Sequence, residues 1–265
     1  MTDYRFSPRA RCHTLIATIA ILAAACGGNK APETPTGNTP PDQFLFQRAS
    51  DSMKRERWLD ARKYYQQIVD NYPQSPLRPD AKLGVGDSYL GEGGDANFVL
   101  AENEFKEFIT FYPTSARVDY AQYKLAMSHF TRMRAPERDQ TESIAAVREF
   151  EVFFDRYPNS MLTNEVREKW RVARSRVSEA SYRVGLYYYR ARWYPGAIDR
   201  FKEVLKSDPG YPGRDAVYYY LAESLLRTPA QKAEAAPYYD RLVKEFDRSE
   251  YLVDAKKKLE TLTAQ

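Results

Sequence analysis

The chain has 265 residues, of which 43% are hydrophobic and 29% are charged, with 40 Lys and Arg against 36 Asp and Glu. This is enough chain for one large or two ordinary domains, and it is too polar for a protein that crosses a membrane many times. Its only cysteines are Cys12 and Cys26, and its only histidines are His13 and His129. So few of these residues exclude a Cys/His zinc cluster and a disulfide framework.

The N-terminus has the three parts of a bacterial lipoprotein signal. Its basic start is formed by Arg5, Arg9 and Arg11. Residues 15–25 then make an apolar run that is too short for the ~20 residues that span a bilayer. Leu22 and three alanines precede Cys26, and this junction resembles the lipobox of bacterial lipoproteins. The resemblance implies that residues 1–25 are removed and that Cys26 carries an S-diacylglycerol and an N-acyl chain such as palmitate. An ordinary secretory signal with an incidental cysteine is the alternative.

Residues 26–42 are expected to form a flexible tether. The segment is rich in proline and has no large apolar side chain, so it cannot bury enough surface to fold. Gly28 stands where an Asp would resemble an inner-membrane retention signal. Without residues 1–25 the chain has 37 basic and 35 acidic residues, and this balance does not predict nucleic-acid binding.

From Phe44 onward the chain has apolar residues at helical spacing and repeats itself. Each of five copies has an alanine, an aromatic residue four positions later and a large apolar residue three positions after that. In four copies a proline follows, which ends the helix at a turn. The alanines are Ala61, Ala101, Ala146, Ala197 and Ala235, the aromatic residues are Tyr65, Phe105, Phe150, Phe201 and Tyr239, and the apolar residues are Ile68, Phe108, Phe153, Val204 and Leu242.

A second small residue precedes each alanine by 12 to 20 positions. A spacing of 12 is typical of the tetratricopeptide (TPR) repeat, whose two antiparallel helices cross closely. We therefore predict an all-α, TPR-like right-handed solenoid of about five helix pairs and a capping helix, or eleven helices, with a generic helical bundle as the alternative. Insertions are expected between the helices of two units, at 91–97 and 134–140, and residues 161–190 are expected to form one long helix. The solenoid is expected to span 43–265, with repeats at about 43–74, 78–114, 119–159, 178–210 and 214–247 and a polar cap at 250–262.

Together these features resemble the BamD family, the TPR lipoproteins of the outer-membrane β-barrel assembly machinery. The marks are the lipidated cysteine with its tether, Arg-Trp-Leu-Asp-Ala at 57–61, and Arg-Asp-Gln-Thr at 138–141, in an insertion that generic TPR units lack. The resemblance runs from Cys26 nearly to the C-terminus. It implies a lipid-anchored protein at the periplasmic face of the outer membrane that assists the folding and insertion of outer-membrane proteins. The implied partners are the POTRA domain of BamA and the other subunits of the machinery.

The resemblance also implies a specific partner contact. In the BamD family an arginine on the second helix of the fourth unit anchors BamA, and the matching residue here is Arg200. The helical pattern independently predicts that Arg200 is exposed, because Ala197, Phe201 and Val204 occupy the packing face of that helix.

No catalytic constellation is visible in the sequence, so we predict a binding scaffold and not an enzyme, with no cofactor and no metal site. The glycine-rich residues 91–94 lack the Lys and Ser/Thr of a phosphate loop. His129 occupies a packing position that usually holds Tyr, and it is expected to be a core or half-buried residue.

TPR stacks bind extended or helical peptides on the face lined by their first helices. Aromatic and basic residues on that face would suit a segment with aromatic side chains and a free carboxylate, such as the C-terminal strand of an unfolded outer-membrane protein. Two alternative functions are a scaffold for cell-wall or division enzymes and an accessory subunit of an export channel. The candidate groove residues are Phe46, Tyr120, Tyr123, Phe130, Tyr182, Tyr189 and Arg190, with Met53, Leu83, Tyr219 and Arg227 also on this face.

Overall fold

A computed structural model of the chain describes residues 39–264. The predicted signal at 1–25, Cys26 and residues 27–38 of the predicted tether lie outside the described residues. The described part contains no β-strand, and its eleven α-helices match the predicted number. They are α1 (Pro41–Lys54), α2 (Trp58–Asn71), α3 (Arg78–Glu92), α4 (Asp95–Phe111), α5 (Val118–Phe130), α6 (Thr141–Arg156), α7 (Thr163–Arg190), α8 (Tyr194–Ser207), α9 (Arg214–Leu226), α10 (Ala236–Glu245) and α11 (Leu252–Thr263), with a 3-10 helix at Pro229–Glu234.

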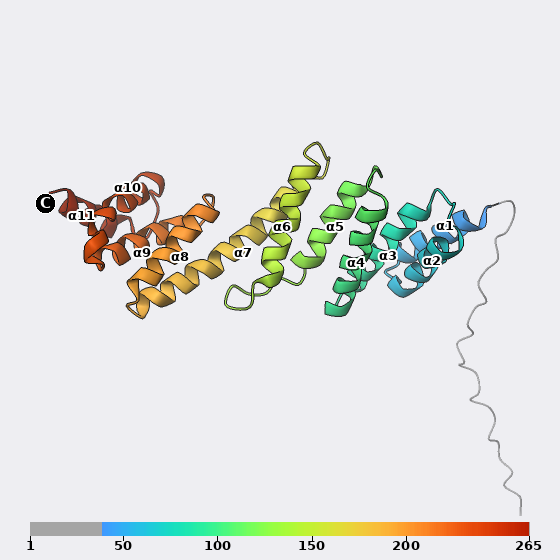
Figure 1. Cartoon of the computed structure of the whole chain (residues 1–265), viewed down its shortest axis with the longest axis horizontal. Helices are drawn as coiled ribbons and strands as arrows, with labels where there is room; N and C mark the ends of the chain where they lie inside the picture. The colour runs from blue at the N-terminus through green and yellow to red at the C-terminus, as the bar shows by residue number, and fades with distance from the viewer. Residues whose placement is uncertain (1–38, 265) are drawn as a thin grey trace, which may run out of the picture. The chain divides into compact units, whose positions relative to one another are not determined.

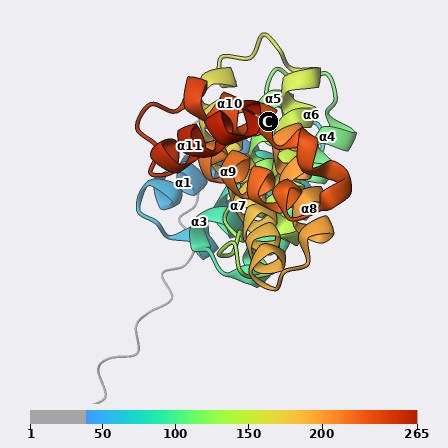
Figure 2. The same cartoon turned by 90° about the vertical axis from the view of Figure 1, so that its left-hand side faces the viewer.

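Each helix packs mainly against the helix before it and the helix after it. Figure 1 shows them following one another in a row from α1 to α11, and Figure 2 looks along that row from the end that holds the last helices. Contacts of this kind between sequence neighbours define a solenoid. The fold is thus the predicted TPR-like α-solenoid of five helix pairs, with α11 as the capping helix.

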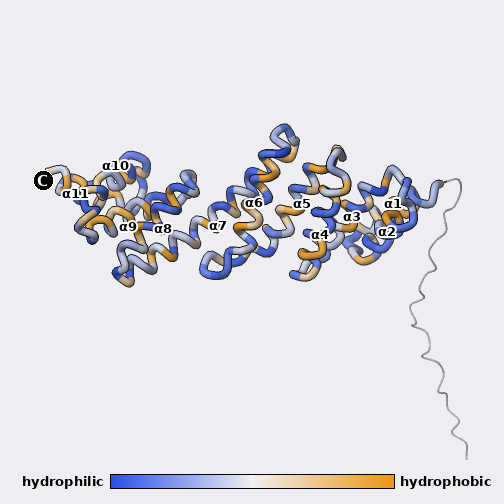
Figure 3. The backbone as a smooth tube through the Cα atoms, viewed as in Figure 1, coloured by the Kyte–Doolittle hydropathy of each residue, from blue (hydrophilic) through white to orange (hydrophobic). Residues whose placement is uncertain are grey.

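The repeated sequence positions form the core. The five alanines, the five aromatic residues and the five apolar residues that recur in the sequence are all buried, and the most exposed of them, Tyr65, is only 6% exposed. Hydrophobic and hydrophilic residues alternate in short stretches along the helices (Figure 3). The predicted register of the repeat is therefore confirmed in all five units.

Two glycines show why the small residue of the first helix is needed. A Cβ atom on Gly86 would lie 2.8 Å from the ring of Phe105, and one on Gly185 would lie 2.7 Å from the ring of Phe201. Real side chains do not approach so closely, so each ring fills the space that its glycine leaves open. The aromatic residue of one helix and the small residue of its partner thus pack as a matched pair.

The long helix and the third-unit insertion are confirmed. α7 spans 28 residues, close to the predicted 161–190, and the third unit has an irregular loop between α5 and α6. The insertion predicted at 91–97 is wrong, because only Gly93 and Gly94 interrupt the helices there. Both glycines have positive φ, 75° and 89°, so they make the turn while their neighbours lengthen α3 and α4.

The N-terminal boundary of the body lies slightly earlier than predicted. α1 begins at Pro41 instead of residue 43, which is consistent with the preference for proline in the first turn of a helix. Within residues 39–264 we find no helix with the length and hydrophobicity that a membrane crossing requires.

Candidate functional site

The first helices of the first three pairs enclose a groove of about 410 Å³. Its apolar side chains come from all three pairs, and they include two methionines. Methionine is flexible and polarizable, so it adapts to bound side chains of different shape. The lining residues are Met53 of α1, Trp58 of α2, Asp87, Leu90 and Gly91 of α3, and Tyr120, Lys124, Met127 and Thr131 of α5 and its C-terminal end.

The ion pair of Asp87 and Lys124 lies on one side of this groove. The hydroxyl of Tyr120 donates to the two carboxylate oxygens of Asp87 at 3.0 and 2.8 Å. Lys124 places its Nζ 3.3 Å from Asp87 Oδ1 and 5.4 Å from the centre of the Tyr120 ring. Burial raises the pKa of the Tyr120 phenol, and the Asp87 carboxylate raises it further, so Tyr120 is a neutral donor.

This arrangement can bind an apolar segment that carries a negative group. The methionines and Leu90 offer apolar contact. Lys124 is the one cation among the groove residues and is about a quarter exposed, so an incoming carboxylate can pair with it while Tyr120 continues to satisfy Asp87. The groove can thus bind a ligand, with Lys124 as the charged contact.

Of the seven groove candidates, the structure brings only Tyr120 to this groove. Phe46 packs edge-on against Tyr65, with ring centres 5.5 Å apart, and Phe130 packs against Phe150 at 6.2 Å. Tyr123 is 7% exposed, and its hydroxyl donates to Glu165 at 2.6 Å. These aromatic residues hold neighbouring helices together.

The remaining three candidates belong to the C-terminal pairs. Tyr182 packs 6.0 Å from the ring of Phe201, and Tyr189 packs 5.1 Å from the ring of Tyr220. Arg190 is exposed at the end of α7. None of the three lines the groove of the first three pairs.

Sequence reasoning missed Trp58, Asp87 and Lys124 as groove residues. Trp58 belongs to the sequence at 57–61 that resembles the BamD family, so the sequence did single it out, although not as a groove residue. The bond between Asp87 and Tyr120 joins residues 33 positions apart. That pairing depends on how two successive first helices are placed, which the sequence pattern does not specify.

Arg200 lies on α8 with its side chain 44% exposed. Ala197, Phe201 and Val204 of the same helix are fully buried, so the predicted exposure is confirmed. The guanidinium donates to Glu203 at 2.9 Å. Both members of this pair are accessible to a partner, and the pair can open at little cost because exposed ion pairs are weak.

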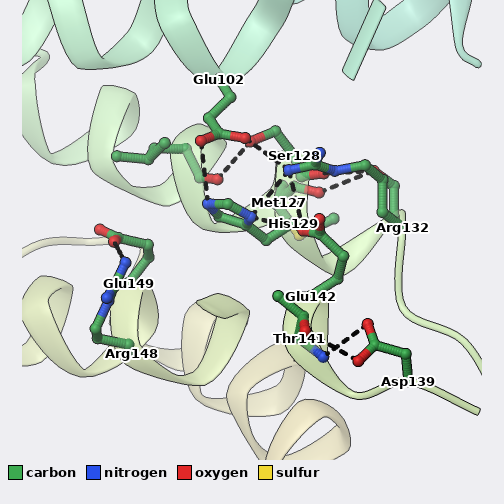
Figure 4. A network of polar contacts seen from close by, with 12 residues as sticks. Glu102, Met127, Ser128, His129, Arg132, Asp139, Thr141, Glu142, Arg148 and Glu149 are labelled. Atoms are coloured by element: carbon green, nitrogen blue, oxygen red, sulfur yellow. Dashed lines mark hydrogen bonds and ion pairs between the residues drawn. The ribbon is translucent and has the colours of Figure 1, made fainter. Parts of the chain in front are cut away.

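A buried polar network links α4, α5 and α6 (Figure 4). His129 is 6% exposed, in agreement with its predicted core position. Its Nδ1 lies 2.8 Å from Glu142 of α6, and its Nε2 lies 3.7 Å from Glu102 of α4. Arg132 pairs with the same two carboxylates, at 2.6 Å from Glu102 and 3.0 Å from Glu142. The network is a set of contacts between helices in which Arg132 pairs with both carboxylates.

The family-like residues at 138–141 organise the loop between α5 and α6. The amide of Gln140 donates to the carbonyls of Ala135 and Arg138 at 2.8 and 2.9 Å. The Asp139 carboxylate accepts from the hydroxyl and the backbone N–H of Thr141 (Figure 4). Side chains of the loop itself therefore hold its backbone in place.

Comparison with known proteins gives one family and several relatives. The family model YfiO, described as an outer membrane lipoprotein, matches residues 38–236. An outer membrane protein assembly factor BamD from Caulobacter vibrioides is 24% identical over 189 residues, which is 71% of this chain and 61% of that protein. Proteins of the same name from Xylella fastidiosa and Helicobacter pylori are 23% and 26% identical and cover 78% and 71% of this chain, and 72% and 84% of their own lengths. The match thus spans less than two thirds of the Caulobacter relative.

Among solved structures, a TPR protein from Thermus thermophilus aligns with 84% of this chain and all of its own, at 14% identity and a TM-score of 0.36. A crystal structure of MamA aligns with 78% of this chain and 93% of its own, at 15% identity and a TM-score of 0.34.

Proposed function

The chain belongs to the YfiO family of outer membrane lipoproteins, and from this premise we propose that it is a binding scaffold in the assembly of outer-membrane β-barrel proteins. Cys26 would carry the lipid that anchors it to the periplasmic face of the outer membrane. The solenoid would bind unfolded outer-membrane proteins and the POTRA domain of BamA. Its role is recognition and positioning, without a chemical step.

The observation that carries this proposal is the extent of the family match. Residues 38–236 run from the start of the body into the fifth helix pair. The match therefore includes both surfaces on which the proposal depends, the groove of the first three pairs and the exposed face of α8. The curated relatives named as outer membrane assembly factors match the chain over 71% or more of its length.

The groove supports the binding of unfolded β-barrel segments. The last strand of a β-barrel can end in the free carboxylate of its chain, and it carries apolar side chains on its lipid-facing side. Lys124 and the apolar side chains of the groove suit these two features. We assign Tyr120 and Lys124 to this binding and Arg200 to the binding of BamA.

Co-purification tests the proposal. The tagged full-length chain is extracted from outer membranes in mild detergent, with a second tagged outer-membrane lipoprotein as the control. We expect BamA to be recovered with the chain and not with the control. Recovery of cell-wall enzymes or of an export channel in place of BamA would contradict the proposal and favour one of the alternative functions.

A further inference from the structure

The turn between α7 and α8 exposes large aromatic side chains. Tyr187 is 68% exposed and Trp193 is 54% exposed, although most aromatic residues of the described body are at least half buried. Between them, Arg190 and Arg192 are exposed as well. We refer to residues 187–193 as the aromatic–arginine turn.

The shape of this turn is fixed by the chain itself. The ring of Tyr188 packs 4.5 Å from Trp193 and 5.9 Å from Tyr187, so the three rings form one cluster. Arg192 has a φ of 61°, and its N–H donates to the Tyr189 carbonyl at 3.0 Å, while the N–H of Trp193 donates to the Tyr188 carbonyl at 2.9 Å. The exposed rings are thus held in place before any partner binds.

The charge of the turn is positive and uncompensated. Residues 187–193 contain two arginines, Arg190 and Arg192, and no Asp or Glu. Within the described residues, neither Arg190 nor Arg192 forms an ion pair with a carboxylate. A protein partner usually presents both signs of charge, and this stretch offers nothing to pair with its cations.

The matching turn of the first unit shows that this charge is not required by the fold. There Glu56 has the positive φ, 56°, and Trp58 begins the next helix. Its arginine, Arg57, donates to Asp60 at 2.6 and 2.9 Å. The same backbone turn is therefore neutralised in the first unit and left cationic in the fourth.

We propose that the aromatic–arginine turn binds the anionic surface of a lipid bilayer. Trp and Tyr are favoured at the boundary between headgroups and acyl chains, where one side of the ring is apolar and the other is wet. Arginine binds phosphate through paired N–H groups. The surface of a bilayer with anionic lipids has a net negative charge, which complements a segment whose only charged side chains are arginines.

This inference rests on the proposed lipid anchor at Cys26, and the length of the tether permits it. α1 has 14 residues and is about 21 Å long. Asp42, at its start, accepts a hydrogen bond from Ser75, so α1 begins at the edge of the stack that holds the turns between repeats. The 12 residues between Cys26 and Thr39 can span at most about 40 Å. This is longer than α1, so a lipid on Cys26 does not prevent the edge that holds the aromatic–arginine turn from reaching the same membrane. Two contacts would fix the orientation of the solenoid on the membrane.

Trp193 provides the readout for a test. The lipidated full-length chain carrying Trp58→Phe and Trp170→Phe is reconstituted in vesicles of equal parts phosphatidylethanolamine and phosphatidylglycerol that contain a brominated lipid. Bromine quenches tryptophan only in close contact, so we expect strong loss of Trp193 fluorescence. In phosphatidylcholine vesicles, and in a variant with Arg190→Gln and Arg192→Gln, the quenched fraction should fall at least about twofold, because each arginine contributes to binding at an anionic surface.

The matched control moves the tryptophan to the other edge of the stack. Phe111 is 69% exposed at the end of α4. In the same background with Trp58→Phe and Trp170→Phe, the chain with Trp193→Phe and Phe111→Trp should not be quenched. Unquenched Trp193 in the anionic vesicles would overturn the proposal, and an effect of the arginine variant on co-purification with BamA alone would show that the turn binds an acidic protein surface. Mass spectrometry of the purified chain shows whether it is acylated. An unacylated chain would disprove the proposed anchor, and binding of that chain to the anionic vesicles then decides whether the turn contacts lipid. Circular dichroism checks that each variant is folded.

Discussion

At the scale of single residues, Lys124 and Arg200 are the two cations on which the proposed function depends, and they differ in their surroundings. Lys124 lies in the groove beside Asp87 and over the ring of Tyr120. Arg200 lies on an open helix face and contacts its neighbour Glu203. A ligand that contacts Lys124 must therefore enter a groove, whereas Arg200 is accessible to the flat surface of a partner protein.

Lys124→Gln should weaken the binding of a peptide that ends in a free carboxylate by about tenfold, since a hydrogen bond to a charged group contributes about 1.5–3 kcal/mol. The same peptide with an amidated C-terminus should bind the variant and the parent protein equally. Fluorescence anisotropy titration of both peptides measures this. Lys244→Gln is the control, because Lys244 is an exposed lysine of α10 that pairs with Asp240. If the substitution lowers the affinity for both peptides equally, Lys124 does not bind the carboxylate.

Arg200→Glu should leave folding intact and weaken binding of the BamA POTRA domain at least about tenfold. An interface arginine can contribute several kcal/mol when its partner is a carboxylate, whereas an exposed one contributes less than about 1 kcal/mol. Circular dichroism and titration with purified POTRA domains provide the two measurements. Arg148→Glu on α6 is the matched control, since Arg148 is also exposed and also pairs with a neighbouring glutamate. Wild-type affinity of the Arg200 variant would mean that Arg200 is not the anchor or that BamA is not the partner.

At the scale of helices, a hydrogen bond between a serine and an aspartate joins the first helix to the turn that ends the unit in four of the five units. In three units a serine of the turn donates to an aspartate in the first turn of the first helix. These pairs are Ser75 with Asp42 at 2.6 Å, Ser160 with Asp119 at 2.6 Å, and Ser249 with Asp215 at 2.7 Å. In the fourth unit the roles are exchanged, because Ser178 of the helix donates to Asp208 of the turn at 2.7 Å. Arg171 also pairs with Asp208, so this turn is fixed to α7 at two points.

The network around His129 predicts how stability depends on pH. Burial raises the pKa of Glu102, but the hydrogen bond from Lys106 and the charges of His129, Lys106 and Arg132 outweigh it and hold that pKa below its usual value of 4.5. The unfolded chain therefore binds the proton more tightly, and the stability from this group is present above pH 4.5 and lost as the pH falls through the lowered value.

Glu102→Gln should consequently lower the free energy of unfolding at pH 7 and make it less dependent on pH in the acid range. Urea denaturation of the variant and the parent protein at a series of pH values checks this. Glu234→Gln is the control, since Glu234 is an exposed glutamate that pairs with Lys202. An acid dependence of Glu102→Gln as steep as that of the parent protein would rule out this role of Glu102.

The crossing of α7 and α8 gives a prediction about packing. Gly185→Leu would push a side chain into the fully buried ring of Phe201, and overpacking of this kind costs about 1–3 kcal/mol or more. We expect a melting temperature lower by several degrees. Val184→Leu is the control, because it adds volume to the neighbouring residue, which is 39% exposed. A melting curve like that of the parent protein for Gly185→Leu would contradict the register of the repeat.

The sequence was sufficient to predict the helix pairs because their packing positions recur with fixed spacing. Ala197 and Phe201 are such positions, and both are fully buried. It was not sufficient for the loop at 91–97, because the residues beside Gly93 and Gly94 are compatible with either helix or loop. The groove was predicted only in part, since Asp87 and Lys124 meet through the stacking of two units and neither belongs to the repeated pattern.

At the scale of the whole molecule, the two proposed binding surfaces lie on different parts of the solenoid. The groove belongs to α1, α2, α3 and α5, whereas Arg200 lies on α8. The long α7 contributes to the core beside α6 with Val166 and Ala173 and packs its Gly185 on Phe201 of α8. An unfolded segment and a POTRA domain could therefore occupy the chain at the same time, which is the arrangement that a scaffold requires.

Anchoring is the property of the whole molecule that the proposed function needs first. Cys26→Ala removes the predicted site of acylation and with it all the acyl chains of the proposed anchor, so the chain should be released from the outer membrane into the soluble periplasmic fraction. Fractionation followed by immunoblotting measures the distribution, and membranes are washed at high salt because electrostatic contacts of the aromatic–arginine turn are screened there. The matched control is Cys12→Ala, which changes the other cysteine of the chain within the segment predicted to be removed. If Cys26→Ala stays on salt-washed membranes from which BamA has been depleted, the chain is held there by something other than a lipid on Cys26.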